Sequence, residues 1–344
     1  MVRIGVLTGR APSLLNVAND IATVYGELNH DVMVFHRQIP FYEAKRLFEK
    51  CIIFMPFDPA YIVPYIVIYR DYLKSEIDTA FYTTVEGRPI DHMITDWMRR
   101  DVETIAVSNY VKEKLEGVDI RVIGVIWHGI DLKLIGKVHR DVERLRRLTG
   151  GEVIYGTVAS SHRRKGLDLL AEAIKLTQDK INAGFYILTE PEAQRHFAGL
   201  RNVYVDTRFG KLDRQSVLRL ISSVHFYICS SLCEGFCLPL LEAQALGVPV
   251  IYPDYAPLNE FINPKINFPF DWERIEDYRE KLGIIYELHV YRPEALAERI
   301  IDAYNLYTSS MDEYVRMGSE AKRYVHENFD IRKMYTGFNK YLRL

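Results

Sequence analysis

The segment from Ser231 to Ala243 limits the possible folds more than any other part of the chain. It reads SLCEGFCLPLLEA and lies between two apolar runs, Val224–Cys229 and Val248–Ile251, which are typical of buried parallel strands. Pro239 suits the first position of a helix, where its missing N–H costs nothing, and Gly247 suits its end. The pattern predicts a strand, a loop, a helix and a second strand, as in an open α/β sheet.

The loop before this helix has the properties of a site for a phosphate next to a sugar. The N–H groups of Phe236 to Leu240 are expected at the carboxyl end of a strand, where open sheets bind ligands. Unpaired N–H groups and the helix dipole attract an anion. Two acids, Glu234 and Glu242, are separated by seven residues, and their carboxylates can accept hydrogen bonds from sugar hydroxyls. A phosphate beside a polyol describes a nucleotide sugar.

This segment closely resembles the signature of retaining glycosyltransferases of family 4, the glycosyl transferases group 1, which have two Rossmann-like domains in the GT-B fold. The resemblance implies that Glu242 holds the ribose of the donor nucleotide and that Glu234 lies near the anomeric carbon of the donor sugar. The alternative is an N-cap acid followed by a solvated helix acid. The resemblance also implies donor contacts from the loop residues Gly235, Phe236, Cys237 and Leu238.

A basic turn, residues 159–166 (ASSHRRKG), resembles the family's loop that places an Arg and a Lys on the donor diphosphate. Lys165 matches the Lys, whereas Ser160 stands at the position of the Arg. Arg163 or Arg164 would then supply the second cation, and the sequence does not decide between them. Such cations stabilise the charge that develops on a departing diphosphate. The alternative is a solvated basic turn.

Two loops of the first half resemble further parts of the family's site. Glu86 stands where the family has a His that contacts the transferred sugar, and we count it with Glu234 and Lys165 as a catalytic candidate. It could equally be an exposed loop acid. Arg10 follows the first expected strand, where the family has a glycine-rich loop that contacts donor phosphate and acceptor.

Three further positions are expected to have supporting roles. Ser108 suits the N-cap of an expected helix, Asn109–Leu115. The turn His128–Asp131 resembles the family's closing turn of the first domain. Glu260, together with Asn259, resembles the loop acid that follows the ribose-binding helix in the family, and we expect it to support the site from behind the residues that touch the ligand.

No metal or other cofactor is expected. The sequence contains no Asp-x-Asp pair, which usually holds Mg²⁺ or Mn²⁺ in metal-dependent glycosyltransferases. Cys229, Cys233 and Cys237 recur every four residues, but they lack the two-residue spacing of common zinc sites. We expect them to be packing residues.

The composition is that of an ordinary soluble globular protein. Of the 344 residues, 48% are hydrophobic and 26% are charged, and the net charge of −2 gives no general attraction to nucleic acid. No leader precedes the first expected strand, and prolines and an acid interrupt the most apolar stretch, Cys51–Tyr69. The cytoplasm is the expected location. The basic stretch Lys137–Arg147 and the aromatic segment Pro40–Phe48 could touch a membrane surface, although solvated faces and interdomain packing explain them as well.

Short apolar runs alternate with amphipathic runs, which predicts doubly wound parallel sheets. Residues 1–135 are expected to form the first Rossmann-like domain, 136–151 a linker with a hinge at Gly150-Gly151, and 152–329 the second domain. Residues 330–344 would return to the first domain as a crossing helix. The expected strands are Val2–Leu7, Asp31–Phe35, Cys51–Phe54, Thr79–Thr84, Thr104–Val107, Arg121–Val125, Val153–Val158, Ala183–Leu188, Asn202–Val205, Val224–Cys229 and Val248–Ile251. The expected helices are Leu14–Leu28, Tyr61–Lys74, Ile90–Arg100, Asn109–Leu115, the basic stretch Lys137–Arg147, Leu167–Thr177 and Asp213–Ile221, with an almost wholly helical chain from Ile275 onward.

The resulting hypothesis is a retaining hexosyltransferase that acts without a metal. UDP-glucose is the first donor expected and GDP-mannose the second, with a glycan, a lipid-linked sugar or a small molecule as acceptor. One alternative is a sugar-nucleotide epimerase on the same fold. The other is a non-catalytic carbohydrate- or nucleotide-binding protein, which the missing Arg and His leave open.

Overall fold

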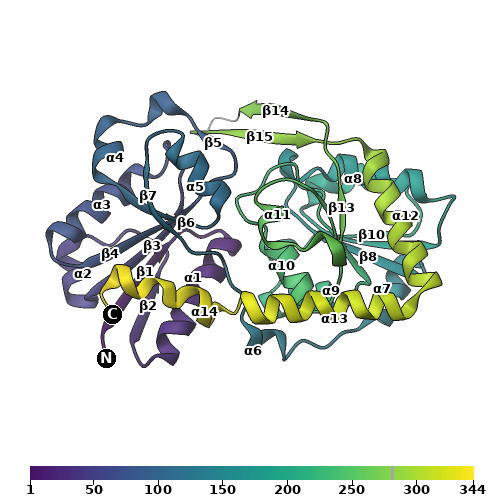
Figure 1. The fold of residues 1–344 in the computed structure, drawn as a ribbon, viewed down its shortest axis with the longest axis horizontal. Coiled ribbons are helices and arrows are strands. Elements are labelled where there is room, and N and C mark those ends of the chain that lie inside the picture. The colour runs from purple at the N-terminus through teal and green to yellow at the C-terminus, as the bar shows by residue number, and fades with distance from the viewer. Residues whose placement is uncertain (280–282) are drawn as a thin grey trace.

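Two six-stranded sheets organise the chain, one in each of two lobes that lie side by side (Figure 1). The structure is a computed structural model, and it describes residues 1–279 and 283–344. The strand orders are β2-β1-β3-β4-β6-β7 and β10-β9-β8-β11-β12-β13, and all neighbours in both sheets are parallel. This confirms the predicted class of two Rossmann-like domains.

From the N-terminus to β7 the first lobe contains the predicted strands and helices in the predicted order, together with a helix, α2, and a short strand, β5 (Arg88–Pro89), that were not predicted. Its strands are β1 (Arg3–Thr8), β2 (Asp31–Phe35), β3 (Lys50–Pro56), β4 (Asp78–Thr84), β6 (Glu103–Ala106) and β7 (Arg121–Val125). Its helices are α1 (Pro12–Glu27), α2 (Phe41–Leu47), α3 (Val63–Lys74), α4 (Asp96–Asp101) and α5 (Asn109–Glu116).

The second lobe repeats the same alternation. Its strands are β8 (Val153–Val158), β9 (Ala183–Leu188), β10 (Val203–Asp206), β11 (Phe226–Ile228), β12 (Val250–Pro253) and β13 (Phe268–Phe270). Its helices are α7 (Val142–Thr149), α8 (Leu167–Thr177), α9 (Arg214–Ser222), α10 (Leu238–Ala245), α11 (Leu258–Phe261), α12 (Pro293–Ser309) and α13 (Met311–Asn328), with α6 (Leu132–Ile135) between the lobes.

Burial of apolar side chains explains why these segments form sheets with helices on both faces. Every residue of β9 is buried, as expected for a parallel strand covered on both sides. The helix α8 buries one face, which carries Leu170 and Ile174, and leaves Glu172 exposed. Each such side chain contributes roughly 1.5–3 kcal/mol when it is fully buried.

The position of the strands fixes where a ligand can bind. In each sheet the order reverses beside the first strand, between β1 and β3 and between β8 and β11. The crevice at the carboxyl ends of strands next to such a reversal is the usual ligand site of open α/β sheets. In the second lobe, the basic turn follows β8 and the Glu234 loop follows β11, so both lie at this crevice.

The prediction of an almost wholly helical chain after Ile275 is wrong. Residues of this region form the antiparallel strands β14 (Arg274–Arg279) and β15 (Ile284–Val290), although residues 280–282 lie outside the described part. The stretch RIEDYR has many residues that favour helices, but pairing with β15 overrides that preference. Helices resume only at α12.

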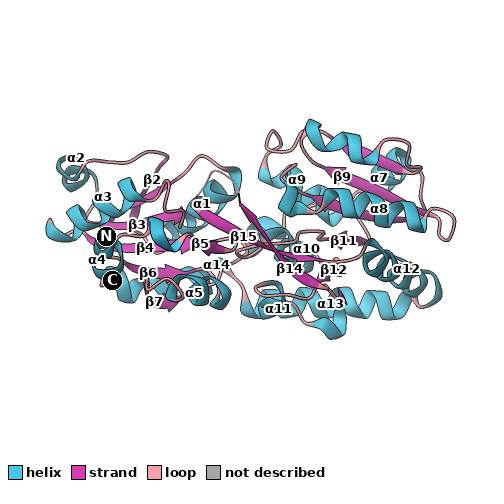
Figure 2. Cartoon of the chain, turned by 90° about the horizontal axis from the view of Figure 1, so that it is seen from above, coloured by secondary structure: helices cyan, strands magenta, loops and turns pink. Residues whose placement is uncertain are grey.

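This hairpin reaches from the second lobe to the first, and we call β14 and β15 the strap. β15 pairs with β5 (Arg88–Pro89) of the first lobe, through Ile284 with Pro89 and Ile285 with Arg88 (Figure 2). Gly87 permits this approach, because a Cβ atom there would lie 2.2 Å from the carbonyl oxygen of Ile285. The strap therefore joins the lobes through backbone hydrogen bonds.

Besides the strap, two crossings of the described chain between the lobes lie side by side. Ile130 pairs with Asp330 as a parallel bridge, and its N–H donates to Phe329 O at 2.7 Å. Beyond this point α14 (Ile331–Tyr335) and α15 (Asn339–Leu342) pack on the first lobe, where the Tyr341 hydroxyl donates to Ile123 O. This confirms the predicted return of the C-terminal helix.

Gly150-Gly151 does not lie at either crossing, contrary to the predicted hinge. Gly150 ends α7 in the left-handed conformation, with φ 81°, and Gly151 packs against β9. A Cβ atom on Gly151 would lie 1.9 Å from the backbone nitrogen of Gly184. The two glycines allow a tight turn and close packing within the second lobe.

Two predicted helices are shorter than expected. The stretch Ile90–Arg100 contains a 3-10 turn, Asp91–Met93, and then α4, because Thr95 between them is extended with ψ 156°. The basic stretch Lys137–Arg147 is helical only from Val142, since the side chain of Asp141 accepts a hydrogen bond from Arg144 N and caps α7 there.

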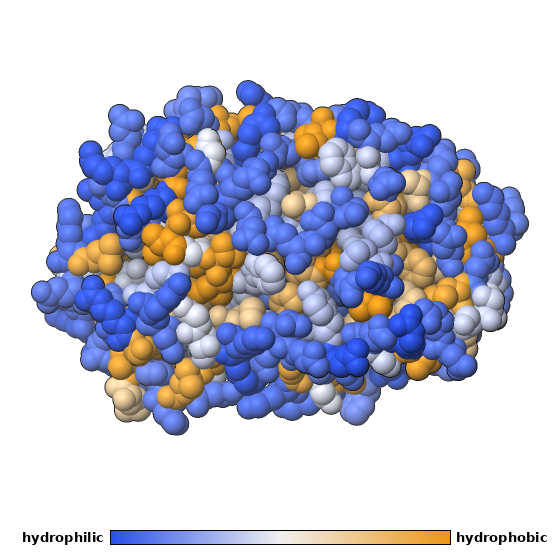
Figure 3. Space-filling view, viewed as in Figure 1, coloured by the Kyte–Doolittle hydropathy of each residue, from blue (hydrophilic) through white to orange (hydrophobic). Residues whose placement is uncertain are grey.

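The face of the molecule in Figure 3 is mainly hydrophilic, and its hydrophobic residues form separate groups. Phe41 and Tyr42 of the aromatic segment are exposed in α2. None of the helices in the described residues is long and apolar enough to span a bilayer.

We predict that Gly151→Ala destabilises the protein by about 1–3 kcal/mol, because the added methyl group would overlap the backbone of β9. Gly26→Ala in α1 is the matched control. A Cβ atom at Gly26 meets nothing within 4 Å, so that variant should gain roughly 0.5–1 kcal/mol. Urea unfolding measures both, and a Gly151→Ala protein as stable as the wild type would refute the packing role.

Candidate active site

A cavity of about 450 Å³ lies between the lobes at the carboxyl ends of the strands. The first lobe contributes the start of α1, Thr84 and Glu86, and the second contributes the loops after β8 and β11 and the start of α10. Glu234 and Glu242 both line it. The two acids predicted from the sequence therefore face one space that both lobes enclose.

The N-terminus of α10 opens into this cavity. Cys237 is its N-cap in a left-handed conformation, with φ 77°, and no side chain caps the helix. Within the described residues, the N–H groups of Gly235, Phe236, Cys237 and Leu238 have no hydrogen-bond acceptor. These donors and the positive end of the helix dipole make the loop suitable for an anion.

Two details of this loop correct the sequence prediction. Pro239 is the second residue of α10 and not the first, since the helix begins at Leu238. The N–H of Leu240 donates to Cys237 O at 3.2 Å, so it is not available to a ligand. The free donors end at Leu238.

A cluster of four charged side chains lies beside these donors. Lys165 Nζ pairs with Glu234 Oε1, and Arg164 Nη1 lies 3.4 Å from Glu234 Oε2. Arg164 Nη2 lies 2.8 Å from Glu86 Oε1 of the first lobe. The formal charges of the four groups sum to zero, so the buried cluster is neutral as it stands.

These contacts determine the charge of Glu234, which is only 4% exposed. Burial raises the pKa of its carboxyl, but Lys165 and Arg164 lower it more, and the net pKa lies below its ordinary value. Glu234 is therefore ionised and acts as a hydrogen-bond acceptor. A group held in this state is not a proton donor at neutral pH.

The structure separates the two arginines of the basic turn. Arg164 and Lys165 line the cavity, and Arg164 also donates to Cys233 O at 3.1 Å. The guanidinium of Arg163 instead lies over the ring of Tyr278 in the strap, 4.8 Å from its centre. Arg164 is thus the arginine placed to replace the one that the family has at the position of Ser160, which also lines the cavity.

Arg10 is exposed and does not line the cavity. Its neighbours Ala11 to Leu14 do, with the first turn of α1. The prediction of Arg10 as an anion ligand is therefore not supported by its position, although its loop is correctly placed.

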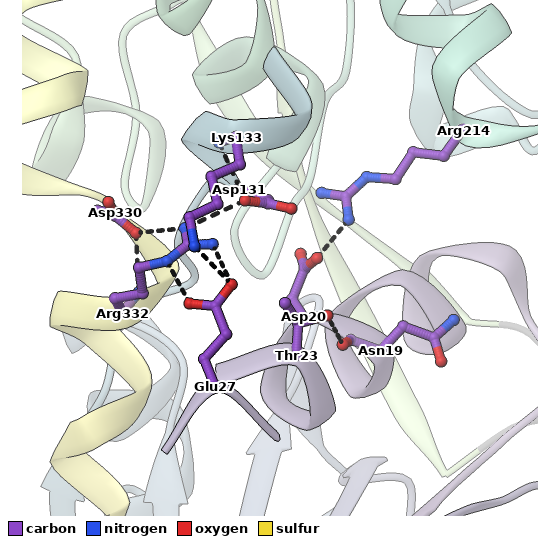
Figure 4. A network of polar contacts seen from close by, with 9 residues as sticks. All are labelled: Asn19, Asp20, Thr23, Glu27, Asp131, Lys133, Arg214, Asp330 and Arg332. Atoms are coloured by element: carbon purple, nitrogen blue, oxygen red, sulfur yellow. Dashed lines mark hydrogen bonds and ion pairs between the residues drawn. The ribbon is translucent and has the colours of Figure 1, made fainter. Parts of the chain in front are cut away.

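Glu242 is 6% exposed and lies one turn into α10. Arg214 of α9 approaches it, with Nη2 3.5 Å from Oε1, and also contacts Asp20 of α1 (Figure 4). Burial raises the pKa of Glu242, and Arg214 opposes that rise. The acid expected to hold the ribose thus has a cationic neighbour that favours its charged form.

Ser108 and Glu260, two of the residues expected to have supporting roles, lie at the junction of the lobes. Ser108 caps α5 as predicted, by accepting from Val111 N, and its hydroxyl also donates to Gly235 O of the second lobe at 3.0 Å. Glu260 does not line the cavity itself. Its carboxylate accepts hydrogen bonds from the N–H groups of Asn109 and Tyr110, at 2.9 and 2.7 Å, and so caps α5 across the boundary between the lobes.

His128 was predicted only as part of a turn, yet its ring lines the cavity. It lies 2.9 Å from the Tyr82 hydroxyl, and its centre is 4.8 Å from that of Phe236. Burial lowers its pKa to about 3, so the ring is neutral. It can present a neutral nitrogen or a ring face to a sugar.

The three cysteines of the loop region do not form a metal site. Cys229 and Cys237 have their sulfurs 3.8 Å apart, and Cys233 donates to Glu86 O. Among residues 1–279 and 283–344, no group of three or more His, Cys, Asp or Glu side chains has the arrangement of a metal site.

Sequence reasoning missed Arg214 and Asp20. Arg214 follows the helix cap Asp213 and shows no pattern of its own. Asp20 did offer a signal, because it is a charged residue on the apolar face of α1, between Val17 and Val24, and such a residue needs a partner.

Comparison with known proteins agrees with this geometry. The family model of glycosyl transferases group 1 matches residues 152–305. An uncharacterized glycosyltransferase 335 of Sulfolobus islandicus rod-shaped virus 1 is 26% identical over 347 aligned positions, which cover 98% of this chain and 99% of that protein. A putative glycosyltransferase, ORF330, of Acidianus filamentous virus 2 is 26% identical over 179 residues, 52% of this chain and 50% of that protein.

Solved structures show the same fold at low sequence identity. HepE from Anabaena, in complex with UDP and glucose, has a TM-score of 0.69 and 13% identity, and each chain is covered completely. Sucrose-phosphate synthase from Thermosynechococcus elongatus has a TM-score of 0.71 and 14% identity, over 100% of this chain and 98% of that one. The chain thus has the GT-B fold of these structures, and its residues 152–305 match the family model of the glycosyl transferases group 1.

Proposed function

We propose that the protein transfers a hexose from a nucleoside diphosphate sugar to a hydroxyl group, with retention of configuration and without a metal ion. One observation carries the proposal: unpaired N–H groups of the α10 N-terminus and the cations Arg164 and Lys165 border the same interlobe cavity, together with Glu242. Anion donors, cations and a carboxylate for hydroxyls are the groups that such a donor requires.

In this proposal the donor diphosphate binds at the start of α10 and takes Lys165 and Arg164 as its partners. Lys165 is now paired with Glu234, and Arg164 is paired with both Glu234 and Glu86. Binding of the diphosphate would release these two carboxylates toward the hydroxyls of the sugar. The two cations would still face an anion, and the negative charge that the diphosphate adds to the cavity would be stabilised by the free N–H groups and the dipole of α10.

The chemical step then needs stabilisation of the leaving group more than a protein nucleophile. The bond from the anomeric carbon to the phosphate oxygen breaks, and the acceptor oxygen bonds to that carbon on the same face. The acceptor proton moves to the phosphate oxygen that departs. Lys165, Arg164 and the N–H groups of the loop would stabilise the negative charge on that diphosphate. In this proposal Glu234, released from the two cations, accepts hydrogen bonds from the sugar hydroxyls and does not attack the anomeric carbon.

UDP-glucose is the first donor proposed and GDP-mannose the second. The solved relative from Anabaena was determined with UDP and glucose, which supports the choice of UDP. The acceptor would approach along the first lobe, past the start of α1 and Glu86. Movement of the lobes would occur at the paired crossings near Ile130 and Asp330.

A screen of nucleotide sugars by thermal unfolding tests the donor class. We expect one donor class to raise the melting temperature by a few degrees, because a ligand that binds only the folded state stabilises it. Glu242→Ala should lose most of that rise, whereas Glu172→Ala, an exposed acid on α8, should keep it. If the donor raises the melting temperature of Glu242→Ala as much as that of the wild type, Glu242 does not bind the ribose.

The products formed from a nucleotide sugar distinguish a glycosyltransferase from the two alternatives, an epimerase and a non-catalytic binding protein. Formation of a glycoside with retained configuration supports the proposal. Release of a free sugar or its epimer would indicate a sugar-nucleotide epimerase or hydrolase, and binding without turnover of any donor would indicate a non-catalytic binding protein.

The two neighbouring arginines give a matched test of the diphosphate site. Arg164→Met should lower kcat by roughly 10²–10³-fold, because it removes a cation next to the departing diphosphate. Arg163→Met should leave kcat unchanged, since its side chain stacks on Tyr278 outside the cavity. Equal effects of the two variants on kcat would refute the assignment of Arg164 to the diphosphate. Circular dichroism checks that both variants are folded, so that a loss of activity is not due to unfolding.

Removal of metal ions tests the role of the cations. We expect the same turnover in excess EDTA and in added Mg²⁺ or Mn²⁺, because Arg164 and Lys165 would already balance the charge of the diphosphate. A loss in EDTA that added metal restores would contradict a metal-independent site.

A further inference from the structure

Arg214 joins the two lobes at the side of the cavity where Glu242 lies. It is the first residue of α9, and its side chain extends toward α1 (Figure 4). Nη1 lies 2.5 Å from Asp20 Oδ1, and Nη2 lies 3.5 Å from Glu242 Oε1. One guanidinium therefore contacts one acid of each lobe.

The three groups depend on one another electrostatically. Asp20 is 4% exposed, and Arg214 is the only cation that pairs with Asp20 or Glu242 in the described residues. Burial raises the pKa of Asp20 to about 6, although Arg214 opposes the rise. Without Arg214, two buried carboxylates would lack a counterion, and they would protonate or turn away.

The contacts leave one carboxylate oxygen of Glu242 free to bind a ligand. Glu242 uses Oε1 for Arg214, and no described residue hydrogen-bonds its Oε2. Arg214 Nε and Asp20 Oδ2 are buried and also lack a partner in that part of the chain. Arg214 and Glu242 line the cavity, whereas Asp20 does not. Asp20 therefore acts on the cavity only through Arg214.

We propose that Arg214 is a positioning residue for Glu242 and that Asp20 anchors it, so that the ribose-binding carboxylate is correctly oriented only while the first lobe is docked. The inference rests on the proposed function, because it takes Glu242 as the ligand of a nucleotide ribose. Arg214 and Glu242 belong to the second lobe and Asp20 to the first. Docking of the lobes and binding of the nucleotide then favour each other.

Affinities for nucleotides with and without ribose hydroxyls test this directly. The probes are UDP and GDP, each compared with its 2′,3′-dideoxy form by calorimetry. The wild type should prefer one of the two hydroxylated nucleotides by roughly tenfold or more over its dideoxy form, because hydrogen bonds to a charged carboxylate are strong. Glu242→Gln should lose that preference.

The inference predicts the same loss in variants that leave Glu242 in place. Arg214→Met should lose the preference for ribose hydroxyls, and Asp20→Asn should weaken it, while both retain binding of the dideoxy form. A general loss of structure would lower both affinities together. Glu27→Gln is the control, since Glu27 lies two turns farther along α1 and pairs with Arg332 and Lys133 rather than with Arg214 (Figure 4).

The outcomes distinguish the inference from the proposed function. If Glu242→Gln loses the preference but Arg214→Met and Asp20→Asn keep it, the inference fails and the proposed function stands. If the wild type binds neither nucleotide, or binds without a preference for ribose hydroxyls, Glu242 does not bind the ribose. In that case the proposed role of Glu242 and the inference are both wrong. Should Arg214→Met not fold, the near-isosteric Asp20→Asn decides alone.

Discussion

Buried carboxylates at the boundary between the lobes require cations, and this requirement determines how the two halves of the chain meet. Arg164 lies between Glu234 of the second lobe and Glu86 of the first, and Arg214 lies between Glu242 and Asp20 in the same way. An unpaired charge in such a place would cost several kcal/mol. Each arginine thus connects an acid of the cavity to the opposite lobe, so the interface and the site rely on the same two guanidinium groups.

The loop that opens α10 is positioned from both sides of this boundary. Its own lobe holds it between β11 and α10, and the first lobe contacts it through Ser108, whose hydroxyl donates to Gly235 O. In the opposite direction, Glu260 of the second lobe caps α5 of the first. Because these contacts are reciprocal, neither lobe presents its part of the site in the same way without the other.

The local pattern of the sequence predicted the fold and much of the second-lobe site. Apolar runs such as Ala183–Leu188 are strands because they are buried on both sides, and the Glu234 loop lies at the cavity because it follows one of them. What the sequence could not supply are partners brought together by tertiary packing. Nothing near Arg214 indicates Asp20, and the helix-favouring stretch Arg274–Arg279 is a strand only because β15 pairs with it. The choice of Arg164 over Arg163 likewise depends on Tyr278 in the distant strap.

The strap has a consequence for the passage of molecules into and out of the protein. It crosses the boundary between the lobes at one edge, while the segment that leads from α13 to α14 crosses it at the other (Figure 1). Because the lobes are connected at both edges, they cannot open widely without breaking backbone hydrogen bonds. Small rotations of the lobes are still possible. Molecules would enter and leave the cavity from the sides that neither connection covers.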